Sequence, residues 1–407
     1  MDCVKLKIAE GVYIPFYKEL MLDILLCIAW APLLLHYMRG VYIRLPFIGE
    51  EHIDKAIAIS VVLTVVCSLP ALINRFSLFD YIFYLLNALY LLSCYVFFPE
   101  NAPFLDENIS ICIFCVFTYY FIGRLIDIEH LWNMLVFLSA ICIFADIFYY
   151  FVLSPINKVA DAVMGNDNMN ASYAALPHVL FLMWSTMQKF RIWKLLVVAV
   201  GILFLLSCGT RGPFLALAFF GIIYFFFYMN FKGAIYVKTG IVTLFALFLG
   251  TLNSTLYYIT FLFMNLNLST RILENLVTGE LGNYSTRSII RDELEEIMEK
   301  GDHFWGLGAF GSNNYNIVYA HFLPLDLAVT FGYFLGYILL FLLAALFVMA
   351  FWLSRGTKRQ IFIIYMFSIS ILKLLFSNTF LLEPYFYMFI GVCMTEIINY
   401  KLSNSKL

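Results

Sequence analysis

Long apolar runs separated by short polar segments dominate the pattern of this chain. Many runs reach about 20 residues, the length at which an α-helix crosses a hydrocarbon core of roughly 30 Å. The runs lack the period of two that marks the strands of membrane β-barrels, so they indicate helices. The pattern predicts twelve membrane-spanning helices, near residues 20–37, 56–73, 78–98, 109–123, 131–153, 171–187, 195–209, 213–229, 239–263, 321–353, 360–377 and 384–400.

The composition supports a membrane protein. Of the 407 residues, 63% are hydrophobic and 13% are charged, whereas soluble domains carry roughly 25% charged residues. We expect an all-α integral membrane protein in which residues 1–407 form a single polytopic domain within the lipid bilayer. The net charge of −2 gives no reason to expect a nucleic-acid partner. No cleavable signal peptide is predicted, because Met1 to Glu19 lacks an apolar core followed by small residues.

The positions of Lys and Arg predict the orientation, because cytoplasmic loops of membrane proteins are enriched in both. The basic residues before spans seven and nine, after span ten and at both ends of the chain fall on one side, which places both termini in the cytoplasm. Arg124 falls on this side too, whereas the loop 38–55 carries basic and acidic residues on the other side. Three segments then face outward: the Asn-rich loop 154–170, the turn 209–212 and the long loop 264–320.

The turn before span eight places a cation at the outer membrane boundary. Gly209 and Gly212 permit a tight turn around Thr210 and Arg211, and Pro213 suits the first turn of the next helix. A fixed guanidinium beside the free N–H groups of a helix N-terminus makes an anion site. Alternatively, Arg211 is an interfacial side chain that reaches the lipid headgroups.

Two more arginines begin a predicted amphipathic helix in the long outer loop. Arg287 and Arg291 lie one turn apart on one face, where like charges repel, so the pair suits an anion bound between them. Alternatively, Arg291 pairs with Glu295 and Arg287 is solvated. The same helix carries an apolar stripe at i, i+4, i+7 spacing, formed by Ile290, Leu294 and Ile297.

Glycines and aromatic residues follow this helix in the segment Phe304-Trp-Gly-Leu-Gly-Ala-Phe-Gly311, which indicates a tight loop at the membrane interface. It is weak evidence for a phosphate-binding loop, because no strand precedes it. The segment leads to His321, which opens span ten. A histidine at the mouth of a membrane cavity can accept a proton near neutral pH, although a lone histidine also serves as a structural hydrogen-bonding residue.

Other polar residues leave alternatives open. Asn168 and Asn170 carry amide donors and acceptors that suit sugar hydroxyls, yet Asn-rich loops also form simple turns. Asp146 and Lys373 lie within apolar helices, where an ionisable residue is either functional or reaches the interface. Cys112-x-x-Cys115 has the spacing of a redox or metal pair, but within a spanning helix it is better explained as two small apolar residues.

Five motifs occur in an order that resembles the O-antigen polymerase and ligase family of bacterial envelope glycosyltransferases, in particular its oligosaccharide repeat unit polymerases. They cover roughly residues 165–345 and are Gly165-Asn-Asp-Asn-Met-Asn-Ala171, Gly209-Thr-Arg-Gly212, Ser285-Thr-Arg287, Trp305-Gly-Leu-Gly-Ala-Phe310, and His321 followed after ten residues by Gly332. The residue after the histidine is Phe322 where the family usually has Asn, and Thr330 stands where the family has an acidic residue. The Arg-x3-Leu pattern of the ligases is not met, because Arg291 follows Arg287 at that spacing.

The resemblance implies a GT-C-like glycosyltransferase that joins oligosaccharide repeat units carried on undecaprenyl diphosphate, at the periplasmic face of the inner membrane. The products would be O-antigen, capsule or exopolysaccharide. It implies catalytic roles for three residues: Arg211 and Arg287 would bind the diphosphate, and His321 would position or deprotonate the acceptor hydroxyl. The residues implied in substrate binding are Arg291, Thr210, Asn168, Asn170 and Asp326.

The donor and acceptor lipids and a chain-length regulator protein are the expected partners. We expect an inverting, metal-independent reaction without a cofactor, because no Asp-x-Asp or other carboxylate cluster lies on the outer face. Three alternatives remain: a ligase that transfers glycan to a lipid core, a flippase for lipid-linked oligosaccharides, and a non-enzymatic scaffold. A flippase would not need paired arginines in one long outer loop.

Overall fold

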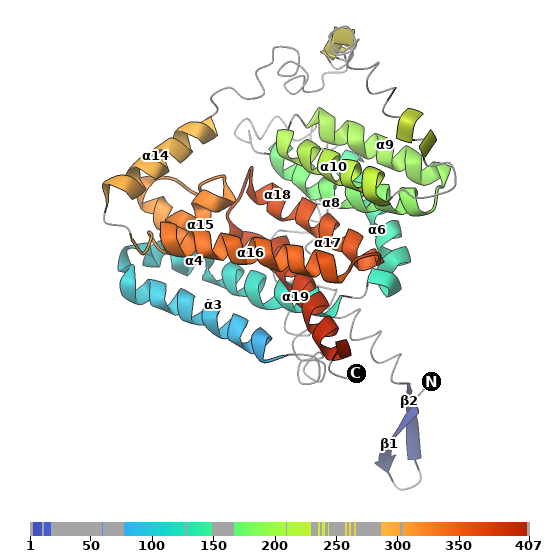
Figure 1. Cartoon of the computed structure of the whole chain (residues 1–407), viewed down its shortest axis with the longest axis horizontal. Helices are drawn as coiled ribbons and strands as arrows, with labels where there is room; N and C mark the ends of the chain where they lie inside the picture. Colours follow the sequence, from blue (N-terminus) through green and yellow to red (C-terminus); the bar gives the residue numbers. More distant parts are fainter. Residues whose placement is uncertain are drawn as a thin grey trace. The chain divides into compact units, whose positions relative to one another are not determined.

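The structure is a computed structural model, and it describes residues 3–9, 12–17, 77–126, 128–148, 167–208, 210–228, 286–301 and 304–404, with isolated positions at 59 and between 235 and 265. The predicted spans 20–37, 56–73 and 239–263 lie wholly or mostly outside this part of the chain. Helices make up nearly all of the described structure (Figure 1).

A short β-hairpin at the N-terminus departs from the all-helical prediction. Strand β1 (Cys3–Ala9) pairs antiparallel with strand β2 (Val12–Tyr17), as Figure 1 shows. The reason is local: apolar residues alternate with Lys5 and Lys7 in the first strand, and β-branched and aromatic residues fill the second.

Five described helices are long and apolar enough to cross a membrane. They are Leu78–Phe97, Pro99–Leu125, Leu131–Phe148, Arg211–Tyr228 and Tyr333–Leu353. The chain is therefore a helical protein with several candidate membrane spans. The second of these helices begins ten residues before the predicted span 109–123, because the polar residues near its start remain helical.

The chain divides into two compact units, residues 1–127 with 387–407, and residues 128–386. The described helices of the first unit are α3 (Leu78–Phe97), α4 (Ala102–Ile113), the π-helical turn η2 (Phe114–Tyr119), α5 (Tyr120–Leu125) and most of α19 (Pro384–Asn404), with the short η1 (Pro99–Asn101) before α4.

A buried ion pair joins helices of the first unit. Asp80 Oδ1 accepts hydrogen bonds from Arg124 Nε at 2.6 Å and from Tyr120 Oη at 2.5 Å, and both charged side chains are almost completely buried. Arg124 Nη1 also donates to Thr395 of α19 at 2.7 Å. Arg124 is thus not simply a solvated loop charge that sets the membrane orientation, because it is buried in an ion pair with Asp80.

The second unit contains the remaining helices: α6 (Ile128–Phe148), α8 (Asp167–Gln188), α9 (Ile192–Ser207), α10 (Arg211–Ile223) with the π-helical η4 (Tyr224–Tyr228), α14 (Thr286–Lys300), η6 (Gly311–Tyr315), α15 (Leu323–Phe331), α16 (Tyr333–Leu353), α17 (Lys358–Ile369), α18 (Ile371–Leu374) and η7 (Phe380–Leu382). Helix α8 packs against α6, α9, α10 and α17. Trp184 lies within this core and stacks edge-on against Trp132 with ring centres 4.7 Å apart.

The predicted span 321–353 is interrupted at Gly332, so α15 and α16 are separate helices. Gly332 has a φ of +82°, which lies outside helical backbone, and the two helices that it joins pack against each other. Leu307 N donates to Val329 O at 2.7 Å, which attaches the glycine-rich loop to α15. The helix break at Gly332 therefore leaves room for the loop 304–311 to pack beside it.

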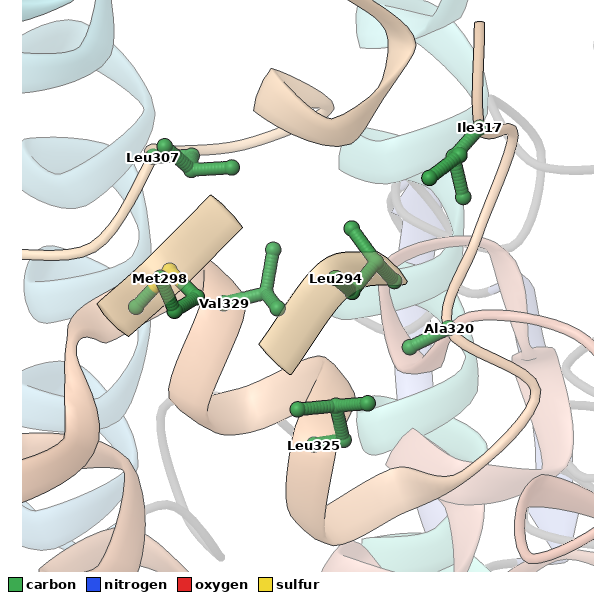
Figure 2. Close-up of a cluster of buried hydrophobic side chains, with 7 residues drawn as sticks. All are labelled: Leu294, Met298, Leu307, Ile317, Ala320, Leu325 and Val329. Atoms are coloured by element: carbon green, nitrogen blue, oxygen red, sulfur yellow. The ribbon is translucent and has the colours of Figure 1, made fainter. Parts of the chain in front are cut away.

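The prediction of an amphipathic helix over the two arginines is confirmed by α14. Leu294 is completely buried in a cluster that Figure 2 shows, with Ile290 and Ile297 packed against it. The members of the cluster are Leu294, Met298, Leu307, Ile317, Ala320, Leu325 and Val329. This cluster holds α14 against α15 and the glycine-rich loop.

Candidate functional site

Four segments that lie far apart in the sequence meet within the second unit. Arg287 Nη2 of α14 donates to Met169 Sδ in the first turn of α8 at 3.4 Å, and Ser377 Oγ donates to the same sulfur at 3.6 Å. A Cβ at Gly212, in the first turn of α10, would lie 2.0 Å from Tyr173 Oη of α8. Only glycine allows this close approach. The starts of α8, α10 and α14 and the end of α18 therefore form one site.

Arg291 is held inside this site by backbone carbonyls. Its Nη2 donates to His321 O at 2.8 Å and to Leu375 O at 3.4 Å. Its guanidinium lies 4.7 Å from the ring centre of Phe322, so this aromatic side chain packs on the arginine. Burial lowers the pKa of Arg291, the Arg287 charge lowers it further, and Glu295 acts in the opposite direction. Glu295 therefore affects Arg291 electrostatically, while the carbonyls hold its position.

His321 does not open a helix, because α15 begins at Leu323 and the histidine itself has a left-handed φ of 55°. Its ring lies 4.3 Å from the Tyr319 ring, and its Nδ1 is enclosed without a hydrogen-bond partner among the described residues. Burial, followed by the charges of Arg287 and Arg291, lowers the pKa of His321 to about 4. In this environment the imidazole is a weaker proton acceptor near neutral pH than a free histidine, and its catalytic role stays a prediction.

Thr210 and Arg211 occupy the start of α10. Thr210 precedes the helix and donates from Oγ1 to Ser172 Oγ of α8 at 2.6 Å. Ser172 Oγ in turn donates to Met169 O at 2.8 Å. Arg211 is the first residue of α10 and is half-buried. The hydroxyl relay attaches the predicted turn to the segment that also contacts Arg287.

Asn168 and Asn170 lie in the first turn of α8 and not in a loop, since the helix begins at Asp167. Both residues are therefore carried by the same helical turn as Met169, which contacts Arg287. Their roles in binding sugar stay a prediction.

The glycine-rich loop and Gly332, two motifs of the predicted resemblance, are in direct contact. A Cβ at Gly332 would lie 1.9 Å from Phe304 O, and one at Gly306 would lie 2.4 Å from Gly332 N. Both glycines have positive φ angles, of +82° and +77°. The aromatic residues Phe304 and Trp305 remain 59% and 71% exposed, which suits side chains at a membrane interface.

Asp326 is buried in α15, and its carboxylate accepts hydrogen bonds from the segment before α19. Its Oδ2 accepts from Thr379 Oγ1 at 2.9 Å and from Phe380 N at 3.1 Å. The cavity beside Asp326 and Thr330 measures about 10 Å³, which is room for a single water and not for a sugar. These contacts position the segment 379–380, and the proposed substrate-binding role of Asp326 stays a prediction.

Sequence reasoning did not find Glu383, which is the partner of Lys373. Lys373 Nζ lies 2.5 Å from Glu383 Oε2 and 5.4 Å from the ring centre of Tyr173. Asn378 Nδ2 donates to the same carboxylate oxygen at 2.9 Å. A lysine in an apolar helix needs a counter-charge, so the position of Lys373 was a signal that an acidic partner lies nearby.

The other residues left open in the sequence are buried. Asp146 is 3% exposed within α6, so it does not reach the interface as a solvated charge. Cys112 and Cys115 are buried free cysteines, in agreement with their interpretation as apolar helix residues. Within the described ranges, no group of three or more His, Cys, Asp or Glu side chains is placed to hold a metal ion.

Taken together, the site presents two neighbouring guanidinium groups, an imidazole with a lowered pKa, a hydroxyl relay and a buried Lys–Glu pair. Such a set can bind an anionic group and orient a hydroxyl beside it. No protein family, curated protein or solved structure matches this chain.

Proposed function

We propose that this chain is a polysaccharide polymerase, an inverting and metal-independent glycosyltransferase that joins oligosaccharide repeat units carried on undecaprenyl diphosphate. It would work at the periplasmic face of a bacterial inner membrane, with twelve spans, a GT-C-like architecture and both termini in the cytoplasm. The motifs that resemble the O-antigen polymerase family support this proposal, and the ligase is the nearest alternative.

The observation that carries the proposal is the pair of arginines beside His321. Two guanidinium groups one turn apart repel each other, and partial burial increases the cost of keeping both charged. Arg291 Nε is enclosed and has no hydrogen-bond partner among the described residues. A diphosphate between the two arginines would offset the repulsion and supply acceptor oxygens, so the arrangement suits this ligand.

The chemistry of transfer matches this placement of charge. Breaking the bond between the donor sugar and its diphosphate leaves negative charge on the departing oxygen. In the proposed enzyme, Arg287 and Arg291 would stabilise that charge, which grows as the reaction approaches its transition state. Arg211, at the start of α10, would add a third positive charge together with the helix N-terminus.

A bound diphosphate would also change the properties of His321. The charges of Arg287 and Arg291 are two of the three causes that lower its pKa. An anion that neutralises them would raise this pKa and make the imidazole a better proton acceptor when the donor is bound. In the proposed enzyme His321 therefore positions the acceptor hydroxyl or assists its deprotonation only in the presence of donor.

The distribution of loop contacts agrees with the proposed orientation. The contacts of the arginine site come from segments predicted to face outward and from the adjoining outer ends of the spans 171–187 and 360–377. Basic residues predicted to be cytoplasmic contact a different set of helix ends: Lys358 lies 5.9 Å from the Trp132 ring centre, and Lys194 donates to Ser185 Oγ at 2.6 Å. This separation supports placing the arginine site on the periplasmic side.

An apolar groove on α16 offers a place for the polyprenyl chain of the donor. The groove has a volume of about 540 Å³ and is lined by Tyr333, Phe334, Tyr337, Ile338 and Phe341. Tyr333 also packs against the cluster of Figure 2, which holds α14 and its arginines. The groove is therefore linked by direct packing to the helix that would bind the diphosphate.

Polymerase activity is tested with the purified protein, a lipid-linked repeat unit and no other enzyme. Products that lengthen by whole repeat units, with or without a chelator, are expected. A strict requirement for Mg²⁺ would refute the metal-independent mechanism, and the absence of any longer product would refute the polymerase.

The glycan profile of a deletion strain separates the alternatives. Loss of the polymerase should leave lipid cores capped with a single repeat. Accumulated polymer on its lipid carrier would instead indicate a ligase, and the absence of exported repeat units would indicate a flippase.

A further inference from the structure

Glu383 has an unusual environment for a carboxylate. Its side chain is completely buried, immediately before α19. Lys373 and Asn378 occupy its Oε2, whereas its Oε1 is enclosed without a hydrogen-bond partner among the described residues. Burying a carboxylate oxygen without a hydrogen-bond donor costs free energy. We therefore expect a substrate group to donate a hydrogen bond to this oxygen.

The carboxylate belongs to the arginine site. Tyr173 lies within electrostatic reach of Arg287, Glu383 and Tyr319, and the Lys373 ammonium lies over its ring. The Tyr319 ring packs at a tilt against the His321 ring, with ring centres 4.3 Å apart. One tyrosine therefore links the cations that would hold the donor diphosphate to the Lys–Glu pair.

The proposed reaction needs a group that the arginines cannot provide. An acceptor hydroxyl becomes strongly acidic as its oxygen attacks the donor sugar, so a nearby base must receive its proton. Among the groups gathered around Tyr173, Glu383 is the carboxylate, and its free oxygen can accept a hydrogen bond from that hydroxyl.

We propose, on the basis of the polymerase function above, that Glu383 is the base for the acceptor sugar hydroxyl and that Lys373 and Asn378 orient its carboxylate. The hydroxyl oxygen forms a bond to the anomeric carbon of the donor sugar, and the bond from that carbon to the diphosphate oxygen breaks. The electron pair of this bond stays on the diphosphate, between Arg287 and Arg291, and the hydroxyl proton passes to Glu383 Oε1.

Two features of the site shape this step. Oε1 is covered by neighbouring side chains, so the acceptor reaches it only after these have moved, as occurs when active sites open and close. Among the residues that the structure describes, the charged and titratable groups that interact with Glu383 include Lys373, Tyr173 and Tyr385. His321 then keeps the task of positioning the hydroxyl.

The test is the variant Glu383→Gln in the purified full-length protein, with a lipid-linked repeat unit as donor and acceptor. We expect turnover to fall by about 10²- to 10⁴-fold, the usual contribution of a general base, while donor affinity stays within about threefold of wild type because Arg287 and Arg291 are untouched. The acidic limb of the pH profile of kcat should also disappear. The matched control is Glu299→Gln on the exposed face of α14, which should retain wild-type turnover.

A second variant separates catalysis from structure. Lys373→Met combined with Glu383→Gln removes both charges of the buried pair, so it relieves the imbalance that a single change creates. If this double variant, or Glu383→Gln alone, transfers at the wild-type rate, Glu383 is not the base.

If Glu383→Gln does not accumulate in the membrane, Glu383→Asp replaces it. This change keeps the charge and withdraws the carboxylate by one methylene. At least a tenfold loss of kcat with unchanged KM is expected, and wild-type kcat would overturn the proposal. A wild-type protein that joins no repeat units would refute the polymerase function instead, so the two failures are distinguishable.

Discussion

The contact between Gly332 and Phe304 makes the replacement Gly332→Ala a sharp test of how the site is built. Gly332 has φ +82° and ψ 157°, a region that is nearly restricted to glycine and costs other residues about 1–3 kcal/mol. The added Cβ would also lie 1.9 Å from Phe304 O, a backbone atom that cannot rotate away. Overpacking of this kind costs about 1–3 kcal/mol. We expect a total destabilisation of about 2–6 kcal/mol.

The damage should reach the arginines, because Leu307 of the displaced loop packs in the same cluster as Leu294 of α14 (Figure 2). A displacement of about 1 Å can cost an enzyme about 10²-fold in rate. The control is Gly356→Ala, whose φ is +77° but whose Cβ would meet no atom within 4 Å. Its free energy of unfolding should fall only by the cost of backbone strain, about 1–2 kcal/mol.

Thermal unfolding of both variants in detergent and the chain-length profile of a complemented deletion strain provide the measurements. We expect Gly332→Ala to unfold at a clearly lower temperature than Gly356→Ala and to yield shortened or no polymer. Equal unfolding temperatures and normal polymer in both variants would show that the loop contact does not position α14.

Three further predictions concern charged residues. Arg287→Ala or Arg211→Ala should abolish long chains while the protein still inserts, and Arg287→Lys should also be impaired because lysine lacks the bidentate fork; normal polymer length in a glycan gel would remove the residue from the diphosphate site. Because the pKa of His321 falls from 6.5 to about 4 in the folded protein, the folded state binds fewer protons than the unfolded state between these values, and stability should decrease as pH falls through this window. His321→Asn should flatten that part of the curve of unfolding temperature against pH, and an unchanged curve would show that His321 does not cause it. Asp80→Asn leaves Arg124 buried without its counter-charge and should cost about 3–5 kcal/mol; the unfolding temperature is the measurement, and a wild-type value would show that the pair contributes little.

Several features could be predicted because they depend on neighbouring residues in the sequence. Apolar runs long enough to cross a membrane recur in the structure as five candidate spanning helices. The apolar stripe of α14 follows helical spacing, so Leu294 could be assigned to the core before any contact was known. The alternating lysines of the N-terminal hairpin are an equally local pattern of period two, but the many apolar runs of the chain favoured an all-helical prediction.

The pairing of charges could not be predicted in this way. Asp80 and Arg124 are 44 residues apart, and Lys373 meets Glu383 across the segment that connects α18 to α19. Whether two such residues form an ion pair depends on how the helices pack, and the hydropathy pattern does not predict that packing. Arg124 consequently looked like an orienting loop charge, and Glu383 was not noticed.

The sequence by itself indicated that this protein is built from apolar helices, because helix length and spacing are local properties, and its motifs singled out Arg211, Arg287, Arg291 and His321 as candidate site residues. Only the tertiary structure decided that Met169, Ser377 and Leu375 lie around the two arginines and that the arginine charges and burial lower the pKa of His321. Burial and electric field are produced by residues remote in the chain, so they exist only once the helices have packed.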